Sequence, residues 1–274
     1  MEEQKKEKAI VLKENVGDEV IERMNKLCDA GFIMPSDFNY VNAVKMTMLK
    51  LQEITDKNGK SVNEVCTPLS ISTALFDMCC KGLNAALSQC YLIIRGDKLC
   101  IEDSYFGKIL RVKRIFPEWE PFPHVIREGE TIEYGIDPDT GRTYLIKHIP
   151  DAKNIDGDFT GGYIYLPTKS EKGNLYIMSK KQILTAWAKS STKEHATHKA
   201  FDEKMISKTL INSGCNMIIN STPEFHAGMA EDIEDDNIKN TPGDAPDQEI
   251  TEFTEVIEPK FEKVNKNTGE IMEF

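Results

Sequence analysis

The spacing of apolar residues along this chain changes twice, and these changes constrain its fold more than any other feature. Up to about residue 82, apolar residues recur at helical spacing, as at Val41, Val44 and Met48. From Cys90 to about residue 178 they fall in short runs separated by turn residues, and helical spacing then returns until about residue 219. Helices, then strands, then helices again predict an α+β fold.

Local end signals accompany most of the predicted helices. These helices span residues 18–28, 37–55, 67–81, 179–190 and 199–219. Thr67 and Pro68 suit the N-cap and first turn of the third helix, and Gly82 suits its C-terminal cap. Ser179 suits the N-cap of the fourth helix. The charged residues 1–15 are expected to form a frayed start.

Strand signals dominate the middle of the chain. Gly96–Asp97 is a two-residue turn between the runs Cys90–Arg95 and Lys98–Glu102, which predicts a β-hairpin. Four further runs span residues 124–136, 142–149, 160–167 and 173–178. The turn sequence DPDTG lies between the first and second of these runs, and SEKG lies between the third and fourth. We therefore expect a central antiparallel β-meander with a hairpin, flanked by helices.

Acidic residues concentrate at the C-terminal end. Residues 229–274 hold 14 acidic residues and 4 lysines, a net charge of −10, against −11 for the whole chain. High charge and few large apolar groups predict disorder there. We therefore divide the chain into a domain of residues 1–228, which is almost neutral, and a disordered acidic tail of residues 229–274. The tail is interpreted either as solubilising chain or as a segment that mimics DNA or binds a host replication protein.

One segment is strongly basic against this background. Four cations fall within seven residues: Lys108, Arg111, Lys113 and Arg114. On a helix capped by Ser104 or Asp103, Tyr105 falls on an apolar face, and Arg111 and Arg114 fall on the opposite face. A concentrated basic face favours an anionic polymer such as nucleic acid. The alternative is the solvated face of an ordinary amphipathic helix.

Sequence motifs of common enzymes are missing. The chain has no GxxxxGK[ST] loop, no GxGxxG after a strand and no GxSxG elbow. Its seven cysteines include no CxxC pair, so neither a zinc site nor a disulfide framework is indicated. The N-terminus lacks a signal-peptide core, and no apolar run is long enough to span a membrane. We expect an intracellular protein that is not an enzyme, needs no cofactor or metal, and does not bind membranes.

Segments over residues 65–220 follow the order and spacing of a known family. They are LSISTALFDMCCKGL at Leu69–Leu83, SYFG at Ser104–Gly107, VIREGE at Val125–Glu130, HIP at His148–Pro150, GGY at Gly161–Tyr163, MSKKQI at Met178–Ile183 and KMISKTL at Lys204–Leu210. Together they resemble the RecT/Red-beta class of phage single-strand annealing proteins, and RecT-type members in particular. Ser104, Phe106 and Asn212 depart from the family pattern, which has glycine, lysine and a cation at these places.

The resemblance implies ATP-independent binding of single-stranded DNA and annealing of complementary strands in phage or prophage recombination, in the cytoplasm of a bacterial host. It implies a homo-oligomer, as a ring or a helical filament, that also holds the annealed duplex intermediate. A phage exonuclease and a host single-strand binding protein are further candidate partners. The alternative on the same fold is a single-stranded DNA-binding or replication accessory protein that does not anneal.

Candidate DNA contacts follow from the basic helix and from two later helices. Phosphate contacts suit an annealing protein because they add affinity without reading sequence. Lys204 and Lys208 lie on one ridge of the last helix, for which a solvated face is the alternative. Tyr105 is interpreted either as a base-stacking ring or as a core residue. The full set of expected DNA contacts is Tyr105, Lys108, Arg111, Lys113, Arg114, Lys180, Lys181, Lys204, Lys208, Thr209 and Asn212.

Overall fold

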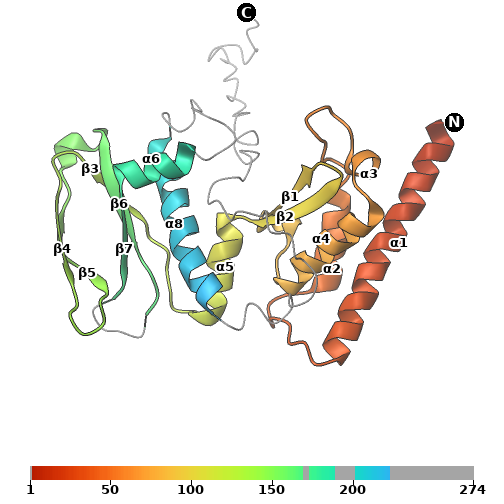
Figure 1. Ribbon diagram of the computed structural model, residues 1–274, viewed down its shortest axis with the longest axis horizontal. Coiled ribbons are helices and arrows are strands. Elements are labelled where there is room, and N and C mark those ends of the chain that lie inside the picture. The colour runs from red at the N-terminus through yellow and green to blue at the C-terminus, as the bar shows by residue number, and fades with distance from the viewer. Residues whose placement is uncertain (1, 169–172, 189–200, 223–274) are drawn as a thin grey trace, which may run out of the picture.

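The computed structural model describes residues 2–168, 173–188 and 201–222 (Figure 1). Its helices are α1 Glu2–Asp29, α2 Tyr40–Lys50, α3 Val62–Val65, α4 Pro68–Cys80, α5 Tyr105–Ile115, α6 Lys180–Ala188 and α8 Asp202–Ser221, with the short 3₁₀ helices η1 Ala85–Leu87 and η2 Ala152–Asn154. Its strands are β1 Cys90–Arg95, β2 Lys98–Asp103, β3 His124–Arg127, β4 Thr131–Ile136, β5 Thr143–Ile149, β6 Phe159–Tyr165 and β7 Leu175–Ser179. The acidic tail predicted over residues 229–274 lies outside the described residues.

The strands form antiparallel sheets, so the predicted α+β class is confirmed. β1 pairs with β2 as the expected hairpin, β4 pairs with β5, and a third sheet has the order β3-β6-β7. The run expected over residues 124–136 divides into β3 and β4 near Gly129, whose φ of +86° suits a tight turn. β3 then pairs with β6, so the β4–β5 hairpin makes a second sheet instead of continuing one meander.

Several helix ends lie where capping residues predicted them. The Thr67 hydroxyl accepts a hydrogen bond from the Ser70 amide at 3.2 Å at the start of α4. The Ser179 hydroxyl accepts one from the Gln182 amide at 3.4 Å at the start of α6. α2 begins later than predicted because Asn39 caps it, accepting from the Asn42 amide at 2.9 Å, and it also ends earlier than predicted, at Lys50.

The first helix is longer than its apolar spacing predicted. α1 begins at Glu2, where a frayed start had been expected over residues 1–15. Glu and Lys favour the helical conformation, and residues 2–8 contain six of them, so local helix propensity extends α1 beyond the apolar pattern. No helix among the described residues is long and apolar enough to cross a membrane.

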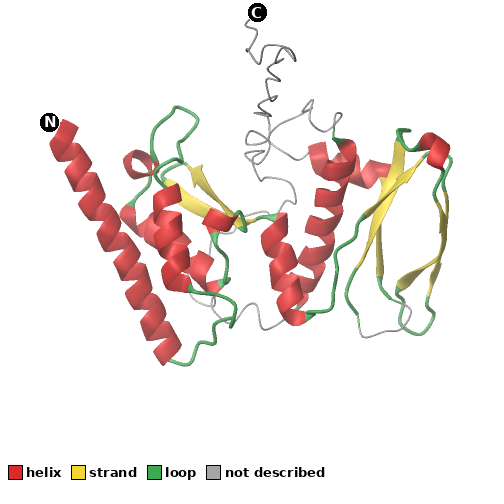
Figure 2. Ribbon diagram, turned by 180° about the vertical axis from the view of Figure 1, so that it is seen from behind, coloured by secondary structure: helices red, strands yellow, loops and turns green. Residues whose placement is uncertain are grey.

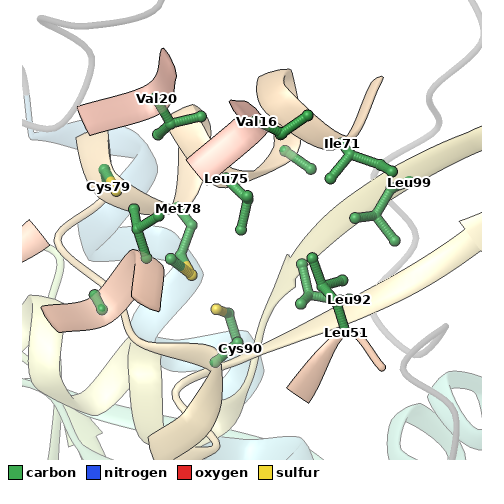
Figure 3. Close-up of a cluster of buried hydrophobic side chains, with 14 of the residues drawn as sticks. Val16, Val20, Leu51, Ile71, Leu75, Met78, Cys79, Cys90, Leu92 and Leu99 are labelled. Atoms are coloured by element: carbon green, nitrogen blue, oxygen red, sulfur yellow. The ribbon is translucent and has the colours of Figure 1, made fainter. Parts of the chain in front are cut away.

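The described residues form three hydrophobic cores, and the two larger ones lie on opposite sides of α5, while the third lies around Ile126, Tyr163 and Leu175. The first core, shown in Figure 3, joins α1, α4 and the β1–β2 hairpin through residues such as Val20, Leu75 and Leu92. The second core gathers α5, α8 and β6 and includes Val112 and Leu210. Figures 1 and 2 show α5 between the helices and hairpin of the N-terminal part and α8 with the remaining sheets. α5 is therefore the element that both parts share.

Candidate nucleic-acid interface

The predicted basic helix is α5, and Ser104 is its N-cap. The Ser104 hydroxyl accepts from the Gly107 amide at 3.1 Å and donates to the Ser88 carbonyl at 2.6 Å. Residue 107 must be glycine for α5 to approach the chain before β1 this closely, since a Cβ there would overlap the carbonyl oxygen of Gln89. The start of α5 is thus positioned by backbone contacts as well as by its cap.

α5 packs along α8, and this packing joins a segment that precedes β3 to one that follows β7. The Lys208 ammonium lies 5.5 Å from the centroid of the Tyr105 ring. The Tyr105 ring lies 4.0 Å from that of Phe106, at an interplanar angle of 33°. Lys204, one turn before Lys208, has its ammonium 5.5 Å from the ring centroid of Phe201. We call these five residues the α5–α8 seam.

The α5–α8 seam alternates accessible rings with ammonium groups. Phe106 is 46 % exposed and Phe201 is 52 % exposed. Lys204 is exposed, and Lys208 and Tyr105 are half-buried. Aromatic faces can stack on bases while nearby lysines bind phosphates, which is how proteins commonly hold single strands without reading their sequence.

Arg111 is buried, although a side chain on a basic or solvated helix face is normally accessible, and its predicted contact with DNA stays a prediction. It is only 7 % exposed, and its guanidinium donates to the carboxylate of Asp103. Asp103 also lies 3.5 Å from the ammonium of Lys81, which binds Asp77 at 3.1 Å. The helical wheel could not reveal this burial, because the face of α5 that carries Arg111 packs toward α4 and β2.

This ion network shifts the pKa values of its carboxyl groups in opposite directions. Burial by itself raises the pKa of Asp103, but Lys81 and Arg111 outweigh burial and hold that pKa below its ordinary value. Burial raises the pKa of Asp77, and its ion pair with Lys81 compensates only in part. Asp103 is therefore the ionised centre that the surrounding cations share.

Arg114 closes the C-terminal end of α4. Its Nη2 donates to the carbonyl of Gly82 at 2.9 Å, its Nη1 to that of Lys81 at 3.4 Å, and its Nε to the Asp37 carboxylate at 3.0 Å. Cations stabilise the negative end of a helix dipole. The arrangement supports a structural role for Arg114, and its predicted contact with DNA stays a prediction.

The other predicted contacts occupy varied settings. Lys113 pairs with Glu120 at 3.1 Å, and Lys180 pairs with Asp158 at 3.3 Å. Lys181 is exposed on α6. The Thr209 hydroxyl accepts from the Trp187 indole N–H at 2.9 Å and donates to the Met205 carbonyl at 2.8 Å, so it joins α6 to α8. Lys108 and Asn212 are half-buried where α5 meets α8.

Two rings of the seam were missed as candidate contacts. Phe106 had been noted only as a departure from the family's lysine, and Phe201 had not been singled out at all. For Phe201 the signal was an aromatic residue three positions before a cation, Lys204. Phe106 has no cation three or four positions away in the chain, so only its neighbour Tyr105 marked it. No group of three or more His, Cys, Asp or Glu side chains within the described ranges could hold a metal ion.

Comparison with known families identifies the chain. Residues 43–246 match the RecT family, which is well over half of the sequence. The chain belongs to the RecT family. Proteins of the RecT family are single-stranded DNA-annealing proteins of recombination. The stretch that matches the RecT family contains α5, α8 and every residue of the seam. No curated protein matches the chain.

Proposed function

We propose that this protein binds single-stranded DNA on the α5–α8 seam and anneals it to a complementary strand without ATP. One observation carries the proposal. Aromatic rings and lysine ammonium groups from α5 and from the start of α8, which are distant in the sequence, lie together in the seam. Membership of the RecT family supports the same activity.

The chemistry of the seam suits annealing because it leaves base edges unread. Lys204 and Lys208 carry ammonium groups that can bind phosphates, and Phe106 and Phe201 offer faces for bases, each stack contributing about 1–3 kcal/mol. Neither kind of contact occupies the Watson–Crick edge of a base. A strand held in this way keeps its bases available to a complementary strand.

Three surface cations outside the seam are proposed as secondary contacts. Lys113 and Lys180 form exposed ion pairs, which contribute little to stability and which a phosphate can replace. Lys181 adds an exposed charge on α6. These residues would extend the site beyond the seam.

We further propose that copies of the chain assemble on the strand, as a ring or a helical filament, and hold the annealed duplex as an intermediate. The setting would be phage or prophage homologous recombination in the bacterial cytoplasm, with a phage exonuclease and a host single-strand binding protein as partners. Residues 1–228 would form the DNA-binding and oligomerising domain.

The test is an annealing assay with two complementary, fluorescently labelled oligonucleotides added in succession without ATP. The wild-type protein should accelerate duplex formation, and Lys204→Ala with Lys208→Ala should lose most of that acceleration while remaining folded. DNA binding without acceleration would favour a single-stranded DNA-binding accessory protein. Full activity in the folded double variant would exclude the seam as the site.

A further inference from the structure

The helix α8 starts at a residue that cannot cap it. Phe201 is the N-cap residue, and its ring carries no oxygen that could accept a hydrogen bond from an amide of the first turn. Three other helices, α2, α4 and α5, each start at a side chain that does accept one, those of Asn39, Thr67 and Ser104. The first amides of a helix have no partner within the helix itself. The start of α8 therefore depends on contacts from other elements.

Arg127 of β3 binds the first turn of α8. Its Nη1 donates to the Asp202 carboxylate at 2.7 Å, and its Nη2 donates to the same carboxylate at 3.3 Å. The Nη1 atom also donates to the Gly157 carbonyl at 2.9 Å, in the loop before β6. Asp202 in turn accepts from the Glu203 amide at 2.6 Å. A bidentate pair fixes orientation as well as distance, so Arg127 helps to set how α8 begins.

The ion pair between Arg127 and Asp202 is largely shielded from water. The side chain of Arg127 is 12 % exposed and that of Asp202 is 31 % exposed, whereas those of Lys26 and Glu22, which pair on α1, are 73 % and 68 % exposed. Pairs as exposed as the one on α1 contribute little to stability. Removing one partner of a shielded pair leaves the other charge without compensation. The pair on α8 is therefore the one whose loss should be felt by its surroundings.

Arg127 is itself held in place by its backbone. Ile126 packs in the third core, and alternation along β3 directs Arg127 to the opposite face, toward α8. The Arg127 amide donates to Glu130 Oε2 at 2.8 Å, and the same oxygen lies 3.2 Å from Nε2 of His148 on β5. Burial by itself raises the pKa of Glu130, but these hydrogen bonds outweigh burial and hold that pKa below its ordinary value. An ionised Glu130 thus anchors Arg127 beside the β4–β5 hairpin.

Two residues of the α5–α8 seam belong to the turn that Arg127 holds. Phe201 directly precedes Asp202, and Lys204 follows two residues later, with its ammonium 5.5 Å from the centroid of the Phe201 ring. We propose that Arg127 is a positioning residue for DNA binding. Acting through Asp202, it sets the place of Phe201 and Lys204 in the seam. The inference rests on the proposed function, because it concerns how the seam is held before DNA arrives, which lowers the cost of ordering it on binding.

The acidic partner separates positioning from simple charge. A carboxylate beside a DNA site repels phosphates, so removing the charge of Asp202 should tighten binding if only its charge matters. If Asp202 instead transmits the position of Arg127 to the seam, removing its charge should weaken binding. The two roles thus predict changes of opposite sign.

The experiment measures the affinity of full-length variants for an oligothymidylate, together with a thermal melt of each free protein. Arg127→Met should weaken binding about five- to tenfold, the size of effect expected when roughly one contact is displaced. Asp202→Asn should also weaken binding, although it removes a negative charge. Arg127→Lys should fall between wild type and Arg127→Met, because an ammonium cannot reproduce the bidentate pair. Lys26→Met is the matched control, since it breaks only the exposed pair with Glu22 and should change affinity by less than about twofold.

A double-mutant cycle tests whether Arg127 acts through the seam. In a protein that carries Phe201→Ala with Lys204→Ala, Arg127→Met should weaken binding by less than about twofold more, because the residues that it positions are gone. The full penalty in that background would overturn the proposal and assign Arg127 to direct contact with DNA. Unchanged or tighter binding in Asp202→Asn would overturn it too, and so would a lowered unfolding temperature in Arg127→Met with unchanged affinity per folded molecule.

Failure of the proposed function would look different. If the wild-type protein does not bind the oligothymidylate, the proposed function itself fails. If Phe201→Ala with Lys204→Ala binds as tightly as wild type, the seam fails as the DNA site, whatever the effect of Arg127→Met.

Discussion

Lys208 of α8 places its ammonium 5.5 Å from the centroid of the Tyr105 ring on α5. Tyr105 packs at the margin of the second core, so its ring both supports that core and orients the lysine. The contacts of Tyr105 support its interpretation as a core residue, and its predicted stacking on DNA bases stays a prediction. The first prediction follows from this pair.

Lys208→Ala should weaken binding of single-stranded DNA about tenfold, the effect of losing about 1.4 kcal/mol from one phosphate contact, and should reduce annealing. The fold should persist because Lys208 is half-buried at the edge of the core. Fluorescence anisotropy with an oligothymidylate and a thermal melt measure the two effects. Lys208→Arg should retain most of the binding, and a large drop in unfolding temperature for Lys208→Ala would favour a structural role instead.

Arg114→Ala should destabilise the protein by about 2 kcal/mol, because it removes donors to the Gly82 and Lys81 carbonyls and to Asp37. Urea unfolding measures the change. Lys113→Ala on the same helix is the matched control and should stay within about 0.5 kcal/mol, because its partner Glu120 is exposed. Stability equal to wild type, combined with weaker DNA binding, would restore the DNA-contact interpretation of Arg114.

Asp103→Asn should destabilise the protein at neutral pH by about 3 kcal/mol, because it leaves Arg111 and Lys81 without their shared carboxylate. The folded state lowers the pKa of Asp103 below its ordinary 3.8. The contribution of this carboxylate is therefore present above about that pH and disappears as the pH falls through the folded-state pKa. The stability difference between the variant and the wild type, measured by urea unfolding, should narrow below pH 3.8. A gap that does not change with pH would show that ionisation of Asp103 is not its source.

Gly107→Ala should destabilise the protein by about 3 kcal/mol, because the added Cβ would overlap the carbonyl oxygen of Gln89 and push α5 away from its place. Gly17→Ala is the matched control within a helix. Its Cβ would meet side-chain atoms of Met48 and Val44 at ordinary contact distances of 3.5 and 3.6 Å. Greater helix propensity should make that variant equal to or more stable than wild type. Equal melting temperatures for the two variants would contradict the close packing of α5.

Truncation after Gly228 removes a net charge of −10 and should leave the domain folded, since the removed residues 229–274 hold few large apolar groups. If this acidic tail competes with DNA for the seam, truncation should tighten DNA binding most at low salt, where screening is weakest. Equal affinity at low salt would leave solubility or partner binding as the role of the tail. Cooperative loss of folding would place the domain boundary further along the chain.

Local signals in the sequence were enough to predict much of the fold. Thr67 and Ser179 cap their helices where predicted, Gly96–Asp97 turns the first hairpin, and Ser104 caps the basic helix. Each of these signals acts on residues within four positions of itself, so no knowledge of distant contacts was needed. The family resemblance, carried by the order of such segments, is confirmed over residues 43–246.

The sequence by itself thus determined the helices, the hairpins and the presence of a basic helix followed by a lysine-bearing one. Only the tertiary structure decided which cations of α5 are accessible, because Asp103 of β2 binds the buried Arg111 while α8 packs against the face of Tyr105. It also decided that β3 pairs with β6 and that Phe106 and Phe201 stay exposed. A helical wheel shows which residues share a face, but burial depends on what the rest of the chain places against that face.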